Sequence, residues 1–252
     1  MSQLDISAQG GPASGWKLSV DEMAQAGVNL GHRVSKLHPK MKQYVSGIKN
    51  NVHTFDLEKT AKELEKSLNF IAKAVADGKN IIFIGTKIQL KAIIQKTAEE
   101  CGLPYVTERW LGGTFTNFET IQKRVSYFKD LEAKKASGAL AKYTKKEQLD
   151  FDKEIAILKT KFEGIRNMAK LPDIVFIAGI DRDITAAREA KRKGIKIVAI
   201  CDTNVNPDIV DYLIPANDDA ISGVQYILDQ VKQTIINSLG RSQTGEAKQA
   251  KV

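Results

Sequence analysis

The feature that most constrains the fold is a series of short apolar runs that alternate with helical segments. The runs cover residues 81–84, 105–106, 174–178, 196–200 and 212–214. Parallel strands are joined by helical crossovers and are buried on both faces, so each strand appears in a sequence as a continuous apolar run. The pattern therefore predicts an α/β fold built on an open, doubly wound, parallel, five-stranded sheet.

Helices are predicted where apolar residues recur at intervals of three and four. The strongest stripe places six apolar side chains on one face: Leu57, Ala61, Leu64, Leu68, Ile71 and Val75. Further helices are predicted over 88–100, 183–193 and 218–238. A capping box that starts at Ser19 predicts a short helix over 19–26. The turn-forming Lys49-Asn50-Asn51 predicts a β-hairpin over 43–56.

Residues 117–170 interrupt the alternating pattern. They contain two helical stripes, one made of Ile121, Val125, Phe128 and Leu131 and the other of Phe151, Ile155, Leu158, Phe162 and Ile165. A capping box, Thr144-Lys145-Lys146-Glu147, opens the second helix. Spacings of three and four on both helices predict an antiparallel, coiled-coil-like helical hairpin that is inserted into the sheet domain.

These elements predict a division into four parts. Residues 1–18 form an N-terminal extension, 19–116 and 171–239 form the sheet domain, 117–170 form the inserted hairpin, and 240–252 form a tail. The tail lacks apolar periodicity, so we expect it to be disordered. The N-terminal residues lack the pattern of a secretory signal, and no apolar run approaches the ~20 residues of a membrane helix. We expect a cytoplasmic protein with no membrane partner.

The charge favours a polyanionic partner. Lys and Arg number 38 against 30 Asp and Glu, a formal net charge of +8, and such a field attracts nucleic acid. Basic residues concentrate in three segments: 31–50, with five basic residues and no acidic one, 117–170, and 182–196. Solubility is the alternative role for these lysines, but surfaces built for solubility intersperse both signs. We predict these phosphate contacts: Arg33, Lys36, Lys40, Lys42, Lys49, Lys87, Arg109, Lys123 and Arg124.

Two motifs resemble parts of catalytic sites. Gly85-Thr86-Lys87 joins a strand to a helix, where anions bind, but it lacks the rest of a nucleotide-binding loop; we predict that Thr86 caps the helix and leaves Lys87 free for an RNA phosphate. Asp202 follows a strand at the carboxyl edge, where doubly wound folds bind ligands. A nucleotide- or metal-dependent enzyme that uses this edge is the alternative function.

A metal site could in principle form from the aspartates near that edge, which are Asp181, Asp183, Asp202, Asp218 and Asp219. Helix capping explains most of them, since Asp at a helix start accepts backbone N–H bonds. The three histidines show no metal-binding spacing, and no nucleophile stands in a recognised motif. We therefore predict no catalytic residue, no metal and no cofactor.

The segment Arg109 to Asn117 contains a tryptophan flanked by an arginine and followed by two glycines. One interpretation is that Trp110 packs under the base of the hairpin while the glycines let the chain turn. The other is that Arg109 and Trp110 present a cation and a ring to RNA. Packing is the interpretation that we favour.

The same segment, with Thr120-Ile121, resembles the signature of the family of the second ribosomal protein of the small subunit. Other blocks resemble that family in the same order, among them Ala26–His32, Pro39–Met41, His53–Thr60, Pro172-Asp173, Asp202–Asn204 and Ile214–Ala220. The resemblance implies a flavodoxin-like sheet and a structural role, without catalysis or a small-molecule substrate, in the bacterial small (30S) ribosomal subunit. It also implies 16S ribosomal RNA and neighbouring ribosomal proteins as partners, notably the first protein of the subunit, which the chain would help to anchor for translation.

Overall fold

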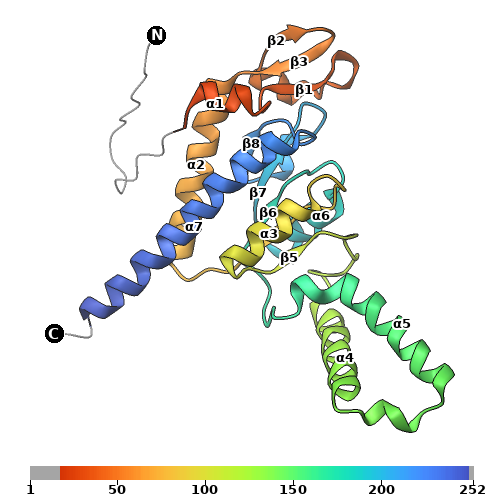
Figure 1. The fold of residues 1–252 in the computed structure, drawn as a ribbon. Helices are drawn as coiled ribbons and strands as arrows, with labels where there is room; N and C mark the ends of the chain where they lie inside the picture. The colour runs from red at the N-terminus through yellow and green to blue at the C-terminus, as the bar shows by residue number, and fades with distance from the viewer. Residues whose placement is uncertain (1–17, 250–252) are drawn as a thin grey trace.

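A parallel five-stranded sheet forms the centre of the computed structural model, which describes residues 18–249, with side chains as far as Leu239 (Figure 1). Across the sheet the order is β5 (Tyr105–Val106), β4 (Ile81–Ile84), β6 (Ile174–Ile177), β7 (Lys196–Cys201) and β8 (Tyr212–Pro215). In chain order this is 2-1-3-4-5, the flavodoxin-like arrangement. The predicted fold class is therefore confirmed.

The sheet separates two apolar cores. All four residues of β4 are buried, and because successive side chains point to opposite faces, Ile81 and Phe83 belong to one core while Ile82 and Ile84 belong to the other. The neighbouring β6 divides in the same way. Burial on both faces explains why the strand sequences are uninterrupted apolar runs.

Four helices cover the first face. They are α1 (Val20–Gln25), α2 (Leu57–Ala76), α3 (Lys91–Cys101) and α7 (Ile221–Gln249). The predicted stripe of α2 is confirmed, since five of its members are buried and Leu57 is partly buried. Figure 1 shows the long α7 crossing the sheet beside α2, which it contacts.

The end of α7 differs from the prediction. We expected disorder over 240–252, whereas the helix continues to Gln249 and only residues 250–252 of that segment lie outside the described residues. Nucleation is the costly step of helix formation. The preceding packed turns have already nucleated α7, so the helix propagates past its last large apolar residue, Leu239. Residues 1–17 of the predicted N-terminal extension also lie outside the described residues.

The second face is covered by α6 (Ile184–Lys193) and by the base of the helical hairpin. The hairpin consists of α4 (Phe118–Ala136), η3 (Ala139–Lys142), α5 (Lys145–Phe162) and η4 (Glu163–Ile165). It replaces the crossover between β5 and β6 and projects from the sheet (Figure 1). Phe128 and Leu158 are among the buried side chains that join its two helices. The predicted capping box of Thr144 and Glu147 is present.

A second, antiparallel sheet is formed by the strands that lie between α1 and α2 in the sequence. Its strands are β1 (Leu30–Arg33), β3 (Val52–Phe55) and β2 (Val45–Lys49), in that order. The predicted hairpin forms β2 and β3, and Asn50 and Asn51 have φ of 50° and 63°, which suits a tight two-residue turn. The sequence did not predict β1, because Leu30-Gly31-His32-Arg33 has no alternating apolar pattern.

Three short 3₁₀ segments complete the described chain: η1 (Val34–Lys36), η2 (Pro39–Tyr44) and η5 (Pro207–Ile209). Among the described residues, no helix has the length and apolar character that crossing a membrane requires.

Candidate functional site

The carboxyl edge of the five-stranded sheet, where related folds bind ligands, is covered by the chain itself. The backbone N–H of His32 donates to Thr203 Oγ1 at 3.0 Å, and that of His38 donates to the Thr203 carbonyl at 2.8 Å. The Asn217 side chain donates to the Gly27 carbonyl at 3.3 Å. Segment 27–38 is therefore fastened over the ends of β7 and β8.

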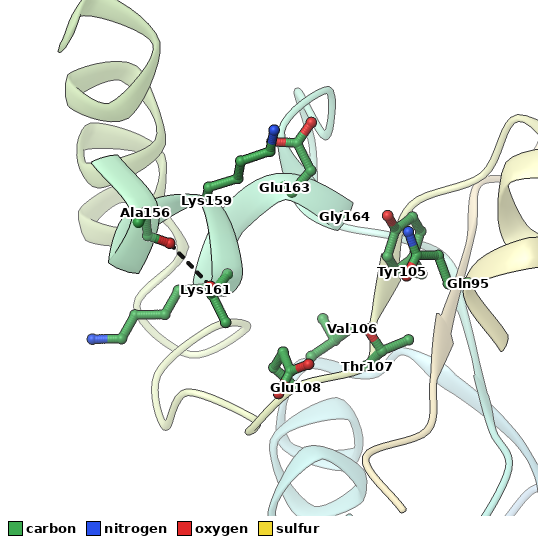
Figure 2. A pocket seen from close by; sticks show the side chains of 11 residues that line it. Gln95, Tyr105, Val106, Thr107, Glu108, Ala156, Lys159, Lys161, Glu163 and Gly164 are labelled. Carbon is green, nitrogen blue, oxygen red and sulfur yellow. Dashed lines mark hydrogen bonds between the residues drawn. The ribbon is translucent and has the colours of Figure 1, made fainter. Parts of the chain in front are cut away.

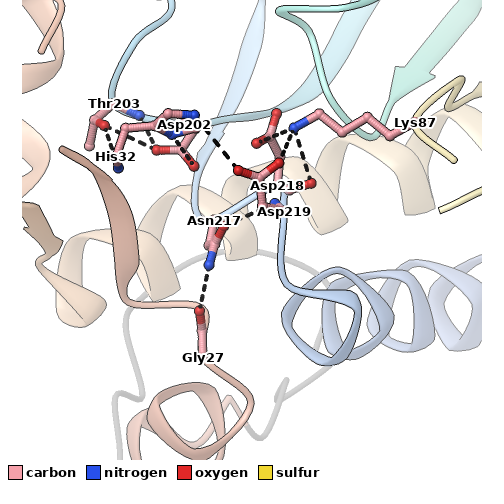
Figure 3. Close-up of polar contacts among 8 residues, drawn as sticks. All are labelled: Gly27, His32, Lys87, Asp202, Thr203, Asn217, Asp218 and Asp219. Carbon is pink, nitrogen blue, oxygen red and sulfur yellow. Dashed lines mark hydrogen bonds and ion pairs between the residues drawn. The ribbon is translucent and has the colours of Figure 1, made fainter. Parts of the chain in front are cut away.

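The Lys87 side chain extends across the carboxyl edge of the sheet, from the end of β4 to the residues that follow β8. Its ammonium donates to Asp218 and Asp219 at 2.7 Å each, and its side chain is only 14% exposed (Figure 3). A Cβ built on Gly179 would lie 3.2 Å from the Lys87 Cε, so the lysine stem passes directly over that glycine. Lys87 is therefore not free for a phosphate, contrary to the prediction.

The pKa values of Lys87 and Asp218 reflect both their burial and their pairing. Burial acts to lower the pKa of the Lys87 ammonium, but the two carboxylates outweigh it and raise the pKa above its usual value. Burial raises the pKa of Asp218 to about 6, although Lys87 opposes the shift. Asp219 is more exposed, and the hydrogen bond from Lys87 lowers its pKa.

Most of the aspartates at this edge join different elements, and the prediction that helix capping explains them is wrong. Thr86 does not cap α3, because its N–H and hydroxyl donate to Asp183 at 3.1 and 2.8 Å. Asp202 accepts from Thr203 and pairs with His32. The sequence could not show the pairs Thr86–Asp183 and His32–Asp202, because their members lie far apart in the chain.

His32, Asp202 and Asp219 form a group whose potential ligand atoms lie within 4.8 Å of one another. His32 Nδ1 is 3.1 Å from Asp202 Oδ2, and His32 Nε2 is 3.7 Å from Asp219 Oδ2 (Figure 3). The hydrogen bond that His32 donates to Asp202 raises the pKa of His32 against the effect of burial. Although the spacing would suit a divalent ion, His32 already pairs with both carboxylates, and Lys87 also pairs with Asp219.

The segment before the hairpin is held by Glu189, a residue of α6 that the sequence analysis did not single out. Its carboxylate accepts from Trp110 Nε1 at 3.2 Å and from the backbone N–H groups of Gly113, Phe115 and Thr116 at 2.8, 3.0 and 3.2 Å. Burial acts to raise the pKa of Glu189, but these hydrogen bonds outweigh it and lower the pKa.

Trp110 is 8% exposed and packs edge-on against Phe115, and Gly113 has a φ of +94°. The interpretation that Trp110 packs under the hairpin is therefore confirmed. Glu189 had one signal in the sequence: it lies on the apolar stripe of α6 beside Ala186 and Ala190, where a charge needs partners.

Seven of the nine predicted phosphate contacts are exposed and, within the part of the chain that the structure describes, form no ion pair. They are Arg33, Lys36, Lys42, Lys49, Arg109, Lys123 and Arg124. Lys40 is paired with Asp208, but both side chains are more than half exposed, and an exposed pair contributes little, so Lys40 can exchange partners. Lys87 is the exception, because its side chain is mostly buried and pairs with Asp218 and Asp219.

The other eight predicted contacts fall into two regions of the structure. Arg33, Lys36, Lys40, Lys42 and Lys49 lie on the small sheet and its 3₁₀ turns. Arg109, Lys123 and Arg124 lie at the base of the hairpin. An open hollow of about 530 Å³ in the first region is lined in part by Lys40, Lys42 and Asp208. Both regions offer cations on open surface, which suits a large polyanion better than a small ligand.

A hollow of about 460 Å³ lies between the edge strand β5 and the end of α5 (Figure 2). Tyr105, Val106, Thr107 and Glu108 line one side of it, and the segment 159–164 lines the other. Its charges are mixed, with Glu108 and Glu163 near Lys159 and Lys161, so the hollow indicates no particular ligand.

Comparison with known proteins gives a consistent result. The family model described as "Ribosomal protein S2" matches residues 23–238. The small ribosomal subunit protein uS2 of Endomicrobium trichonymphae is 39% identical over 238 residues, which cover 93% of this chain and 98% of that protein. The uS2 proteins of Dehalococcoides mccartyi strain BAV1 and Francisella tularensis subsp. novicida are each 39% identical, over 87% and 90% of this chain and 90% and 95% of their own lengths.

Proposed function

The chain belongs to the ribosomal protein S2 family and is a structural constituent of the small ribosomal subunit, and we propose that it binds 16S ribosomal RNA through exposed basic surfaces. We further propose that it helps to anchor the first protein of the small subunit for translation, and that it works in the cytoplasm with the ribosome. The family is one of ribosomal proteins and not of enzymes.

One observation supports RNA binding above the others: the cations of residues 31–50 are exposed in a segment that contains no acidic residue. Each Lys or Arg that contacts a phosphate releases condensed counterions, so several such residues on one surface produce strong, salt-dependent attraction with little base specificity. The surface around Arg33 and Lys36 has this character.

The alternative, a nucleotide- or metal-dependent enzyme, requires an open carboxyl edge. Segment 27–38 and the Lys87 side chain occupy that edge, and His32 and Lys87 pair with the carboxylates there. The structure thus gives the alternative no support.

The anchoring role rests on the family, and one feature of the surface is compatible with it. Leu30, Val34 and Ile48 are 45%, 37% and 60% exposed on and beside the small sheet. Apolar side chains suit contact with protein better than contact with phosphate, so a neighbouring protein can share this region with RNA.

The test is binding of the full chain to 16S ribosomal RNA over a range of salt concentrations, with transfer RNA as competitor. The variant R33Q/K36Q/K42Q/K49Q removes four of the exposed cations. Its slope of log K against log salt should be less steep by about 3, at roughly 0.7 to 0.9 per phosphate contact.

A matched control removes four exposed lysines of α2 and the turn after it, in the variant K62Q/K66Q/K73Q/K79Q. The net charge changes equally, so a smaller slope change in the control separates specific contacts from general charge. Equal binding of the two RNAs by the unaltered chain would refute the proposed function.

A further inference from the structure

Helix α6 and its flanking residues carry more positive surface charge than their sequence suggests. The exposed side chains include six basic ones: Arg182, Arg188, Lys191, Arg192, Lys193 and Lys196. The two acidic residues within 182–196, Asp183 and Glu189, are only 2% and 6% exposed, whereas Asp181, just before this segment, is exposed. Within 182–196 the positive charge is therefore on the surface while the negative charge is buried.

Hydrogen bonds hold both acids inside. Asp183 accepts from Thr86, and Glu189 accepts from the segment Trp110 to Thr116. Neither carboxylate can turn outward to neutralise the helix surface without leaving several donors unpaired, and an unpaired buried donor costs roughly 1 to 3 kcal/mol.

Four of the six cations remain available. Lys196 pairs with Asp211 at 2.8 Å, and Lys191 donates to the Asp208 carbonyl at 2.8 Å. Within the described residues the other four make no ion pair with any carboxylate: Arg182, Arg188, Arg192 and Lys193. Arg188 and Arg192 are one helical turn apart and so lie side by side on the same face.

The position of α6 connects the two regions of predicted phosphate contacts. At one side, the Asp208 carbonyl accepts a hydrogen bond from Lys191 of α6, and the Asp208 carboxylate pairs with Lys40 of η2. At the other side, Glu189 holds the segment that follows Arg109 and leads into α4. Figure 1 shows α6 between the small sheet and the hairpin, in agreement with these contacts.

We propose that the exposed face of α6 binds the phosphate backbone of RNA through Arg182, Arg188, Arg192 and Lys193, and joins the two basic regions into one continuous surface. This inference rests on the proposed function. Three of the four cations are arginines, which can bind a phosphate with two parallel hydrogen bonds. None of the described side chains of α6 is a large exposed hydrophobic of the kind that anchors a protein interface.

The variant R182Q/R188Q/R192Q/K193Q tests the proposal in the full chain. All four side chains are exposed, so far-ultraviolet circular dichroism and the unfolding midpoint should match those of the unaltered protein. The slope of log K against log salt for 16S ribosomal RNA should become less steep by about 2 to 4. The α2 variant K62Q/K66Q/K73Q/K79Q removes the same charge from the opposite face of the sheet and serves as the control.

The outcomes separate this inference from the proposed function. If the α6 variant has the slope of the control while the unaltered chain still prefers 16S ribosomal RNA, the inference is wrong and the proposed function stands. If the α6 variant keeps its RNA slope but fails to enter small-subunit particles, the face contacts a protein, and the inference is likewise overturned. If the unaltered chain shows no preference for 16S ribosomal RNA, the proposed function fails, and the inference fails with it.

Discussion

Removal of the Glu189 carboxylate should be among the most damaging single changes to this protein. In Glu189→Ala the donors that the carboxylate satisfies lose their acceptor. Two of these hydrogen bonds, from Trp110 Nε1 and from the Phe115 N–H, are buried, and water cannot replace them readily. The bonds from Gly113 and Thr116 are only partly buried, so water can reach those groups.

The two buried donors set the magnitude. At roughly 1 to 3 kcal/mol for each buried donor left unpaired, Glu189→Ala should lower the free energy of unfolding by about 2 to 6 kcal/mol. Domains of this kind are stable by only about 5 to 15 kcal/mol, so the loss is a large fraction of the total. The segment that leads into the hairpin should loosen first.

The assay is urea unfolding, followed by circular dichroism and by the fluorescence of Trp110. Trp16 lies outside the described residues, so a Trp16→Phe background isolates the signal of Trp110. Glu119→Ala, at an exposed position of α4, is the matched control, and it should change stability by less than about 0.5 kcal/mol.

The pH dependence provides a second check. The pKa of Glu189 is lowered in the folded protein, so its contribution to stability is present above the unfolded value of about 4.3 and is lost as pH falls through the folded value. The gap between the unaltered protein and Glu189→Ala should therefore narrow in acid. If Glu189→Ala lowered the free energy of unfolding at neutral pH by no more than Glu119→Ala does, the role given to this carboxylate would be refuted.

Two further predictions concern stability. The pKa of His32 is raised by Asp202, so its contribution is full below the unfolded pKa of about 6.5 and is lost as pH rises through the folded value; His32→Gln should remove this decline from a series of urea unfolding curves, and an unchanged decline would contradict the pairing. A Cβ on Gly164 would lie 2.2 Å from the Tyr105 carbonyl oxygen, so Gly164→Ala should lower the free energy of unfolding by roughly 1 to 3 kcal/mol. Gly112→Ala is its control, since nothing lies within 4 Å of that position, and equal thermal midpoints for the two variants would show that the backbone relieves the clash.

The sequence was sufficient for most elements of the fold, because local chemistry specifies them. Uninterrupted apolar runs marked the strands, a three-and-four spacing marked α2 and the hairpin, and the Thr144 capping box marked the start of α5. It failed at β1, where Leu30-Gly31-His32-Arg33 carries no periodic signal, and at the end of α7. In both places neighbouring structure, rather than the local residues, decides the conformation.

Some features of the candidate site could likewise be predicted from the sequence, and others could not. Positive charge on segment 31–50 could be predicted from the sequence alone, since a run of cations without acids has few partners nearby. The state of Lys87 could not be predicted, because its partners Asp218 and Asp219 lie more than 130 residues further along the chain.

The tertiary structure also decided which charges are on the surface. In the sequence, the acids of segment 182–196 reduce its net charge, but in the fold Asp183 and Glu189 turn inward to donors from the turn after β4 and from the loop before α4. The order of the strands brings those donors to α6, and local periodicity does not specify that order. The sequence thus determined the amount of charge and the type of fold, whereas only the packing of distant segments determined which charges remain available to a partner.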